Sequence, residues 1–195
     1  MTLPLSTGQS GGKLIIVSGP SGVGKGTLLR RVRQTGLFPL VMSVSATTRA
    51  KRPGEEDGVD YYFLTREDFL ARRSRGEFLE SFEVYPGGAL YGTLTEPVAR
   101  RLEEGKWVIL EIDVKGARQV LQTFPDAVSI FVLPPSFEDL EKRLRGRGTE
   151  SEESLAKRLA QAKSELASAD EYKYRVVNDR LDDAVADLTA ILKNC

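Results

Sequence analysis

Residues 19–27, with the sequence Gly-Pro-Ser-Gly-Val-Gly-Lys-Gly-Thr, constrain the fold of this chain more than any other segment. They follow the apolar run 14–17 and precede the amphipathic run 27–32, a pattern that predicts a buried strand, a glycine-rich turn and a helix. Glycines let successive backbone N–H groups turn inward around an anion, and the helix N-terminus adds partial positive charge. The spacing G-x-x-x-x-G-K indicates a phosphate loop, in which Lys25 reaches the outer phosphates of a nucleoside triphosphate. The alternative is a chance glycine-rich turn, which the flanking strand and helix disfavour.

Along the rest of the chain, apolar runs alternate with helical patterns, which predicts an α/β fold with a mostly parallel sheet flanked by helices. Strands are expected at residues 14–18, 40–45, 107–113, 128–133 and 174–178. Helices are expected at residues 25–33, 65–75, 97–104, 114–123, 136–145, 151–168 and 182–193. Thr65 and Ser136 are each followed three residues later by an aspartate, so both are predicted to cap a helix.

Two stretches interrupt this alternation. Residues 46–92 are rich in Arg, Gly, Glu, Asp and Tyr, with one predicted helix and short strands such as 60–64, which indicates an inserted substrate lobe. Residues 145–150 form a charged, glycine-containing turn between two predicted helices. Glycines there permit hinge motion, so we expect this turn to act as a lid.

The composition excludes several classes of function. The 28 basic and 28 acidic residues cancel, so no charge pattern for nucleic acid or an anionic membrane is evident. The absence of histidine excludes imidazole catalysis, and the single Cys195 excludes an intramolecular disulfide. No apolar run approaches the ~20 residues that span a bilayer, and residues 1–12 are typical of a loose tail rather than a signal peptide. We therefore expect a cytoplasmic protein.

Two further segments carry residues suited to phosphate chemistry. Glu111 and Asp113 end an apolar predicted strand and would share one face, where a carboxylate could serve a magnesium ion at the edge of the sheet. The alternative is an ordinary polar strand end. Residues 43–55 combine hydroxyls and cations, which suits either a phosphate monoester site or a polar surface loop.

A set of short motifs gives the chain a family resemblance. The motifs are SATTR at 45–49, RPGE at 52–55, GVDY at 58–61, GEFLE at 76–80, YGT at 91–93, EID at 111–113, GRGTE at 146–150 and VND at 177–179. Their order and spacing, from residue 13 to about residue 193, resemble the guanylate kinase family. The resemblance implies phosphoryl transfer from ATP to GMP, giving ADP and GDP with Mg²⁺, as part of purine nucleotide metabolism.

The resemblance also implies a domain organisation. A flexible tail at 1–12 would precede one domain at 13–195. Its P-loop NTPase core would comprise residues 13–44, 94–142 and 160–195, with a mixed α/β GMP-binding lobe at 45–93 and a small lid at 143–159.

On the ATP side, the resemblance assigns the phosphates to the phosphate loop and places Asn178 near the adenine. The loop residues are Gly19, Pro20, Ser21, Gly22, Val23, Gly24, Lys25, Gly26 and Thr27. The cations that close over the phosphates would be Lys25, Arg143, Arg147 and Arg158. Because Gly26 takes the usual hydroxyl position after the lysine, Thr27 is the hydroxyl candidate for the metal, together with Asp113 acting through water.

On the GMP side, the resemblance assigns one set of side chains to the phosphate and another to the base. The phosphate set is Ser45, Arg49, Arg52, Tyr61 and Tyr91, of which Arg49 would also be catalytic. The base set is Glu80 and Thr93 with Ser45 nearby, and Glu111 and Asp113 would also lie near GMP, with Asp113 counted as catalytic. Leu90 stands where the family often has tyrosine.

The base set also agrees with the chemistry of guanine. Guanine presents two adjacent donors, N1–H and N2–H₂, beside the acceptor O6. The Glu80 carboxylate can accept from both donors, and a hydroxyl such as Thr93 can donate to O6. Adenine lacks the paired donors and would leave the carboxylate buried without partners.

Two other functions share parts of this pattern. Guanylate-kinase-like modules in scaffolding proteins bind peptides without the reaction, but they do not need Lys25 or the lid arginines that this chain has. A relative acting on another small phosphate, such as a sugar phosphate, would not need the guanine-matched pair Glu80 and Thr93. The expected small-molecule partners are thus ATP and GMP, with dGMP left open, and no nucleic acid, membrane or obligate protein partner is expected.

Overall fold

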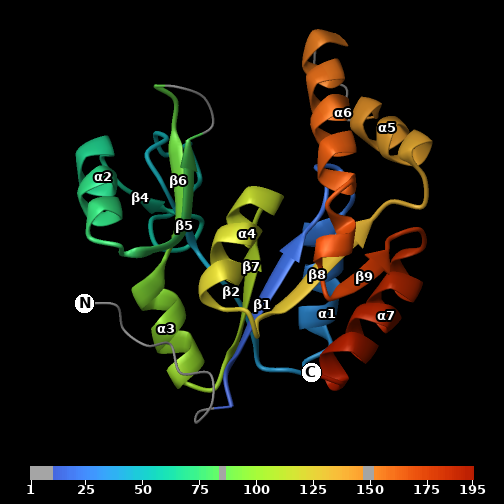
Figure 1. Ribbon diagram of the computed structural model, residues 1–195, viewed down its shortest axis with the longest axis horizontal. Coiled ribbons are helices and arrows are strands. Elements are labelled where there is room, and N and C mark those ends of the chain that lie inside the picture. The colour runs from blue at the N-terminus through green and yellow to red at the C-terminus, as the bar shows by residue number, and fades with distance from the viewer. Residues whose placement is uncertain (1–10, 84–86, 147–151) are drawn as a thin grey trace. The chain divides into compact units, whose positions relative to one another are not determined.

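The computed structural model describes residues 11–83, 87–146 and 152–195 (Figure 1). The helices are α1 (Lys25–Gln34), α2 (Arg66–Ser74), α3 (Thr95–Glu103), α4 (Val114–Thr123), α5 (Phe137–Arg145), α6 (Glu152–Leu166) and α7 (Leu181–Lys193), with a short 3₁₀ turn η1 (Ala169–Glu171). The strands are β1 (Lys13–Ser18), β2 (Leu40–Met42), β3 (Ser45–Thr47), β4 (Tyr62–Phe63), β5 (Phe78–Glu83), β6 (Leu90–Leu94), β7 (Trp107–Glu111), β8 (Val128–Leu133) and β9 (Tyr174–Val177).

The strands form two sheets, and the larger one confirms the predicted α/β class. Its order is β2-β7-β1-β8-β9, and the β2–β7, β1–β8 and β8–β9 pairs are all parallel. The smaller sheet has the order β4-β3-β6-β5 and contains the antiparallel pairs β3–β6 and β5–β6. Parallel neighbours require crossover connections, which the helices between the strands supply.

The chain divides into two compact units. Of the described residues, we call 15–39, 111–114, 128–146 and 152–195 the phosphate-loop unit, and 11–14, 40–83, 87–110 and 115–127 the lobe unit. Each unit has its own buried apolar side chains and is described by itself below. The finer division into core, lobe and lid stays a prediction.

In the phosphate-loop unit, apolar strands lie beneath amphipathic helices. Figure 1 shows β1, β8 and β9 side by side, with α1 packed on α7 and α5 beside α6. Leu28 of α1 and Leu188 of α7 are almost completely buried, as are the middle residues of β8. This packing fixes the segment between β1 and α1, where the glycine-rich turn lies.

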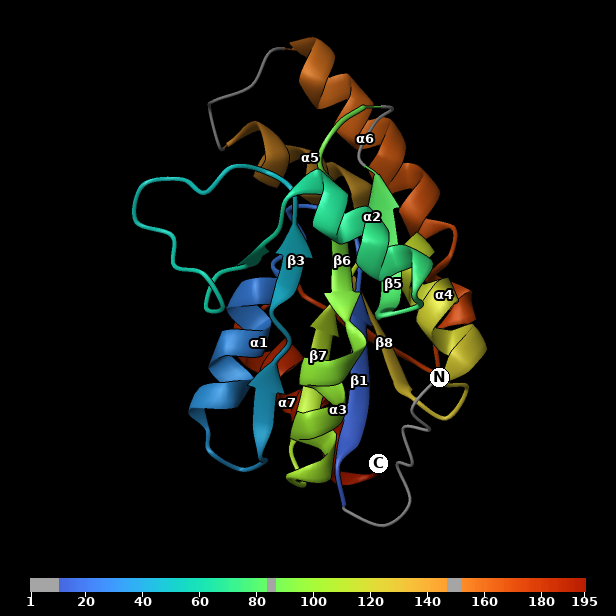
Figure 2. The same ribbon diagram turned by 90° about the vertical axis from the view of Figure 1, so that its left-hand side faces the viewer.

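In the lobe unit, α2 covers one face of the small sheet (Figure 2). Its Phe69 is fully buried against Leu90 of β6 and stacks on Phe78 of β5, with ring centroids 4.3 Å apart. Leu90 is itself fully buried, so the residue that replaces the common tyrosine of the family serves the core of the lobe.

Several sequence predictions of element boundaries were wrong. The expected strand 40–45 is two strands in different sheets, since β2 ends at Met42 and β3 begins at Ser45. The expected strand 107–113 ends at Glu111, because the Ile112 N–H and carbonyl bond to Val17 and Ser18 instead. Helix α3 begins at Thr95 rather than Pro97, and strands β5 and β6 were not predicted.

The two predicted helix caps are confirmed. Thr65 Oγ1 accepts a hydrogen bond of 3.0 Å from the Asp68 N–H, and Ser136 Oγ accepts one of 3.0 Å from the Asp139 N–H. Among the helices in the described ranges, none is long and apolar enough to cross a lipid bilayer.

Candidate active site

The glycine-rich turn has backbone angles that favour glycine. Gly19, Gly22 and Gly24 have φ values of 145°, 85° and 96°, which residues with a Cβ rarely adopt. Space is also restricted, since a Cβ on Gly19 would lie 2.4 Å from the Val132 carbonyl oxygen. The turn can therefore adopt this backbone conformation only with glycine at these positions, as the phosphate-loop prediction requires.

Lys25 is the first residue of α1, and its side chain lies back over the turn. Its Nζ donates to the Gly19 carbonyl at 2.6 Å and to the Pro20 carbonyl at 3.2 Å. Burial lowers the pKa of Lys25, while the nearby carboxylates of Glu111 and Glu165 oppose that shift. The ammonium group is thus held at the rim of the loop, where the charge of a phosphate would lie.

Two side chains donate hydrogen bonds to the Val23 carbonyl of the glycine-rich turn. Asn178 follows β9 and is 7 % exposed, and its Nδ2 donates to the Val23 oxygen at 2.8 Å. Arg143 of α5 donates to the same oxygen at 3.3 Å and to the Asn178 carbonyl at 3.0 Å. Asn178 therefore supports the backbone of the loop, a role that was not predicted from the sequence.

A second contact joins the loop to α6. Arg158 Nη2 donates to Ser21 Oγ at 2.6 Å. The lid prediction put Arg143, Arg147 and Arg158 around the triphosphate. Arg143 and Arg158 do lie against the loop, whereas Arg147 lies outside the described residues.

Carboxylates gather near the start of α1. A Cβ placed on Gly26 would lie 3.9 Å from Glu111 Oε2. Burial raises the pKa of Glu165, the Lys25 charge lowers it, and the charge of Asp113 raises it further. Glu165 belongs to no motif in the sequence analysis, and only its packing in α6 brings it to the loop.

The role of Asn178 can be tested directly. Asn178→Ala should lower the free energy of unfolding by about 1–3 kcal/mol, because it removes a buried hydrogen bond and a donor to the Val23 carbonyl. It should also raise the KM for the nucleoside triphosphate that the loop is predicted to bind, measured by steady-state kinetics beside thermal denaturation.

Asn194→Ala is the matched control, since Asn194 makes a similar bond of 3.0 Å to a backbone carbonyl at an exposed helix end. Equal effects of the two substitutions would mean that Asn178 does not support the loop.

In the lobe unit, strand register places the predicted base set in one row. Ser45 of β3 lies opposite Thr93 of β6, and Thr93 lies opposite Glu80 of β5. Thr93 is fully buried, Glu80 is 3 % exposed, and Thr93 Oγ1 donates to Glu80 Oε1 at 2.7 Å. A buried carboxylate and two hydroxyls thus form one polar row across the sheet.

Gly92, which precedes Thr93 on β6, lets β5 approach β6 closely beside this row. A Cβ there would lie 2.7 Å from the Glu80 carbonyl oxygen and 2.8 Å from the Phe78 ring. A larger residue at position 92 would therefore push β5 away from β6.

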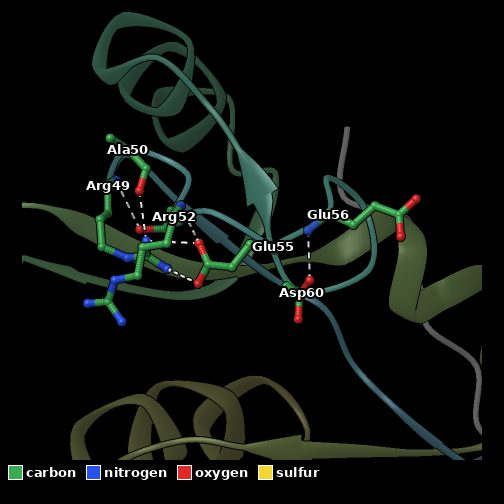
Figure 3. Close-up of polar contacts among 7 residues, drawn as sticks. Arg49, Ala50, Arg52, Glu55, Glu56 and Asp60 are labelled. Atoms are coloured by element: carbon green, nitrogen blue, oxygen red, sulfur yellow. Dashed lines mark hydrogen bonds and ion pairs between the residues drawn. The ribbon is translucent and has the colours of Figure 1, made fainter.

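Two members of the predicted phosphate set, Tyr61 and Tyr91, lie beside Arg49, which follows β3. Its guanidinium carbon lies 5.3 Å from the centre of the Tyr61 ring, and the Tyr61 and Tyr91 rings are 6.1 Å apart. The hydrogen bonds that Arg49 donates to Glu55 and then its hydrogen bond with Tyr91 raise the pKa of Arg49, which keeps it fully charged. Arg52 lies at the start of the next turn with an exposed side chain. Figure 3 shows this loop and the Glu55 carboxylate directed at Arg49, a pairing that the sequence analysis did not predict.

A cavity of about 690 Å³ in the same unit is lined by none of the predicted site residues. It lies between the end of α2 and the start of α3. Its charged side chains are paired with one another, since Arg72 and Arg75 bind Glu77, and Arg100 binds Glu96. We assign it no ligand.

Comparisons with known proteins agree with one another. The family model described as guanylate kinase matches residues 11–195. The guanylate kinase of Trichormus variabilis is 52 % identical over 184 residues, which cover 94 % of this chain and 90 % of that protein. The guanylate kinase of Bifidobacterium longum is 51 % identical and covers 93 % of each chain. The crystal structure of guanylate kinase from Anaplasma phagocytophilum superposes with a TM-score of 0.72 at 33 % identity, covering 94 % of this chain and 85 % of that chain.

Proposed function

The chain belongs to the guanylate kinase family and is an ATP:GMP phosphotransferase. We propose that each of its two units binds one of the two substrates. The phosphate-loop unit holds the triphosphate of ATP through the loop N–H groups, Lys25 and Arg158. The lobe unit holds GMP, with the base on the row Ser45, Thr93 and Glu80 and the phosphate on the cluster around Arg49.

The observation that carries this proposal is the buried Glu80 carboxylate beside Thr93. Burying a carboxylate is costly unless donors approach it. The N1–H and N2–H₂ groups of guanine supply two such donors side by side, and a sugar phosphate or an adenine base does not. The same feature therefore supports GMP over the sugar phosphate left open by the sequence.

The phosphate of GMP fits the cationic and hydroxyl groups in the same unit. Arg49 offers N–H donors in the planar arrangement that matches phosphate oxygens, and the Tyr61 and Tyr91 hydroxyls add further hydrogen bonds. Arg52 is exposed and able to reach an anion bound beside Arg49. Together these groups orient one phosphate oxygen as the nucleophile.

During transfer, that oxygen attacks the γ-phosphorus of ATP in line with the bond to the β–γ bridging oxygen. The new P–O bond forms as the bond to the leaving ADP breaks, and negative charge spreads over the transferring group. Lys25, Arg143 and Arg158 stabilise this charge from the loop, α5 and α6, so the chain contributes mainly positioning and electrostatics.

Magnesium fits the donor set at the loop. Within the described ranges, no group of three or more Asp, Glu or Cys side chains is arranged so that it could hold a metal ion by itself. Mg²⁺ needs no such cluster, because it keeps several waters and binds substrate phosphates with one or two protein oxygens. Thr27, which is exposed, and Asp113, which is half-buried, supply a hydroxyl and a carboxylate in the phosphate-loop unit. The ion would neutralise phosphate charge when bound.

A substrate panel tests the proposal. ADP release should require GMP and Mg²⁺, and kcat/KM for GMP should exceed that for AMP by about 10²-fold or more, because adenine lacks the paired N1–H and N2–H₂ donors that guanine offers to the buried carboxylate. A coupled assay with GMP, dGMP, AMP, UMP and a sugar phosphate, with and without EDTA, measures this. Faster use of AMP, UMP or the sugar phosphate would overturn the assignment of the base row. Use of dGMP, a cytoplasmic location and the lack of an obligate protein partner stay predictions.

A further inference from the structure

Glu55 holds Arg49 from one side only. The Glu55 carboxylate accepts hydrogen bonds of 2.8 Å from Arg49 Nη2 and 3.0 Å from Arg49 Nη1 (Figure 3). The second N–H of Nη1 donates to the Ala50 carbonyl at 2.7 Å. These contacts use three of the five guanidinium N–H groups, and the Nε–H and the second Nη2–H lie on the adjacent edge, which Glu55 and Ala50 do not contact. Arg49 also forms a hydrogen bond with Tyr91, another residue of the phosphate set.

The turn that carries Glu55 is itself built to hold the carboxylate in place. Gly54 has a φ of 86° after Pro53, and the Glu55 N–H donates to the Arg52 carbonyl at 3.1 Å, which is the pattern of a type II turn. Glu55 Oε2 accepts in return from the Arg52 N–H at 2.8 Å. The carboxylate is thus fixed by its own turn as well as by Arg49.

The pair is stable at physiological pH and shielded from water. Arg49 and Glu55 side chains are only 18 % and 19 % exposed. Hydrogen bonds from Arg49 and then from the Arg52 N–H lower the pKa of Glu55 to about 2, so the carboxylate stays ionised at neutral pH. Tyr61 and Phe63 pack against the guanidinium, with ring centres 5.3 and 5.8 Å away, and restrict its rotation.

We propose that Glu55 is a positioning residue that holds Arg49 by the Nη1–Nη2 end so that the Nε–Nη2 edge is left for the phosphate of the nucleoside monophosphate. This inference rests on the proposed role of Arg49 in binding GMP. An arginine has two edges that can each accept an oxyanion through two parallel N–H bonds. A carboxylate on one edge and a phosphate on the other would use four of the five N–H groups without competition, and the fifth donates to the Ala50 carbonyl.

The alternative is that the Glu55 carboxylate occupies the position of the GMP phosphate and so inhibits GMP binding. If the carboxylate occupied the position of the phosphate, it would have to leave before GMP could bind, and removing its charge would strengthen binding. Departure would break the bonds to both Arg49 nitrogens and to the Arg52 N–H, for which the turn offers no replacement. The positioning role keeps all of these bonds in the complex.

The experiment compares Glu55→Gln with Glu56→Gln in the full chain. Glu56 is an exposed neighbour whose carboxylate points away from Arg49 in Figure 3, so this variant controls for the loss of one charge. Glu55→Gln should raise the KM for GMP about 10-fold or more, leave the KM for ATP unchanged, and leave the inhibition constant of guanosine unchanged, because guanosine has no phosphate. Glu56→Gln should change none of these values. Thermal denaturation checks that the variants are folded.

An Arg49→Ala background separates this inference from the proposed function. Arg49→Ala should itself raise the KM for GMP, and adding Glu55→Gln should then have no further effect. A normal KM in Arg49→Ala would refute the phosphate site, whereas a raised KM there with a normal or lowered KM in Glu55→Gln would refute the positioning role alone. An equal rise for GMP and guanosine would also refute it, since that pattern indicates general disruption of the lobe.

Discussion

Lys25→Met should lower kcat about 10²- to 10³-fold while the chain stays folded. The ammonium group is held over the glycine-rich turn by its bonds to the Gly19 and Pro20 carbonyls, and we propose that it faces the outer phosphates of ATP there. Removal of one preorganised charge or donor from a transition state costs about 2.7–4 kcal/mol, which corresponds to this loss. The loss should appear in kcat more than in KM, because the charge on the transferring group is largest in the transition state.

The fold should tolerate this substitution, since Lys25 is the first residue of α1 and burial already disfavours its charge. Lys142→Met is the matched control, because Lys142 is an exposed lysine on α5 in the same unit. Single-turnover and steady-state rates, with thermal denaturation of both variants, complete the measurement. If Lys25→Met keeps more than about a tenth of the rate, Lys25 does not stabilise the transferring phosphoryl group.

Glu80→Gln should lower kcat/KM for GMP about 10- to 100-fold. The Thr93 hydroxyl donates to Glu80 Oε1, so the glutamine oxygen would keep that bond and its NH₂ group would take the place of Oε2. A donor would then face the N1–H and N2–H₂ donors of guanine. Loss of a hydrogen bond to a charged group costs about 1.5–3 kcal/mol, which gives this range.

The most specific readout of Glu80→Gln is the preference for GMP over inosine monophosphate, whose base lacks the N2 amino group. Wild-type protein should prefer GMP, and the preference should shrink in the variant. Glu83→Gln is the control, because Glu83 lies on the same strand but pairs with Arg66 at the surface. An unchanged preference in Glu80→Gln would exclude Glu80 from base recognition.

The sequence predicted the phosphate loop and most of the helices because their signals are local. Glycine spacing, a preceding apolar run and cap residues such as Thr65 and Ser136 act within a few positions of one another. The whole of β8, residues 128–133, is predicted correctly because a buried parallel strand is a continuous apolar run.

The lobe was harder to predict because its strands depend on distant partners. β5 and β6 contain Glu80 and Gly92, residues that are rare in strands, and they are accommodated by one specific pairing. Glu55 and Glu165 illustrate the same limit within the candidate site. Their roles arise from a turn and a helix that bring them to Arg49 and Lys25, and no residue spacing alone indicates these encounters.

Strand β6 carries one residue of the phosphate set and one of the base set at a fixed spacing. Tyr91 and Thr93 are two residues apart on one strand, so their side chains leave the same face at points roughly 7 Å apart, at 3.4 Å per residue. One end of this interval belongs to the phosphate set and the other to the base set. Under the proposed assignment, the lobe would select ligands by the distance between base and phosphate, so we expect ligands with a longer or shorter spacer to engage only one end of this interval.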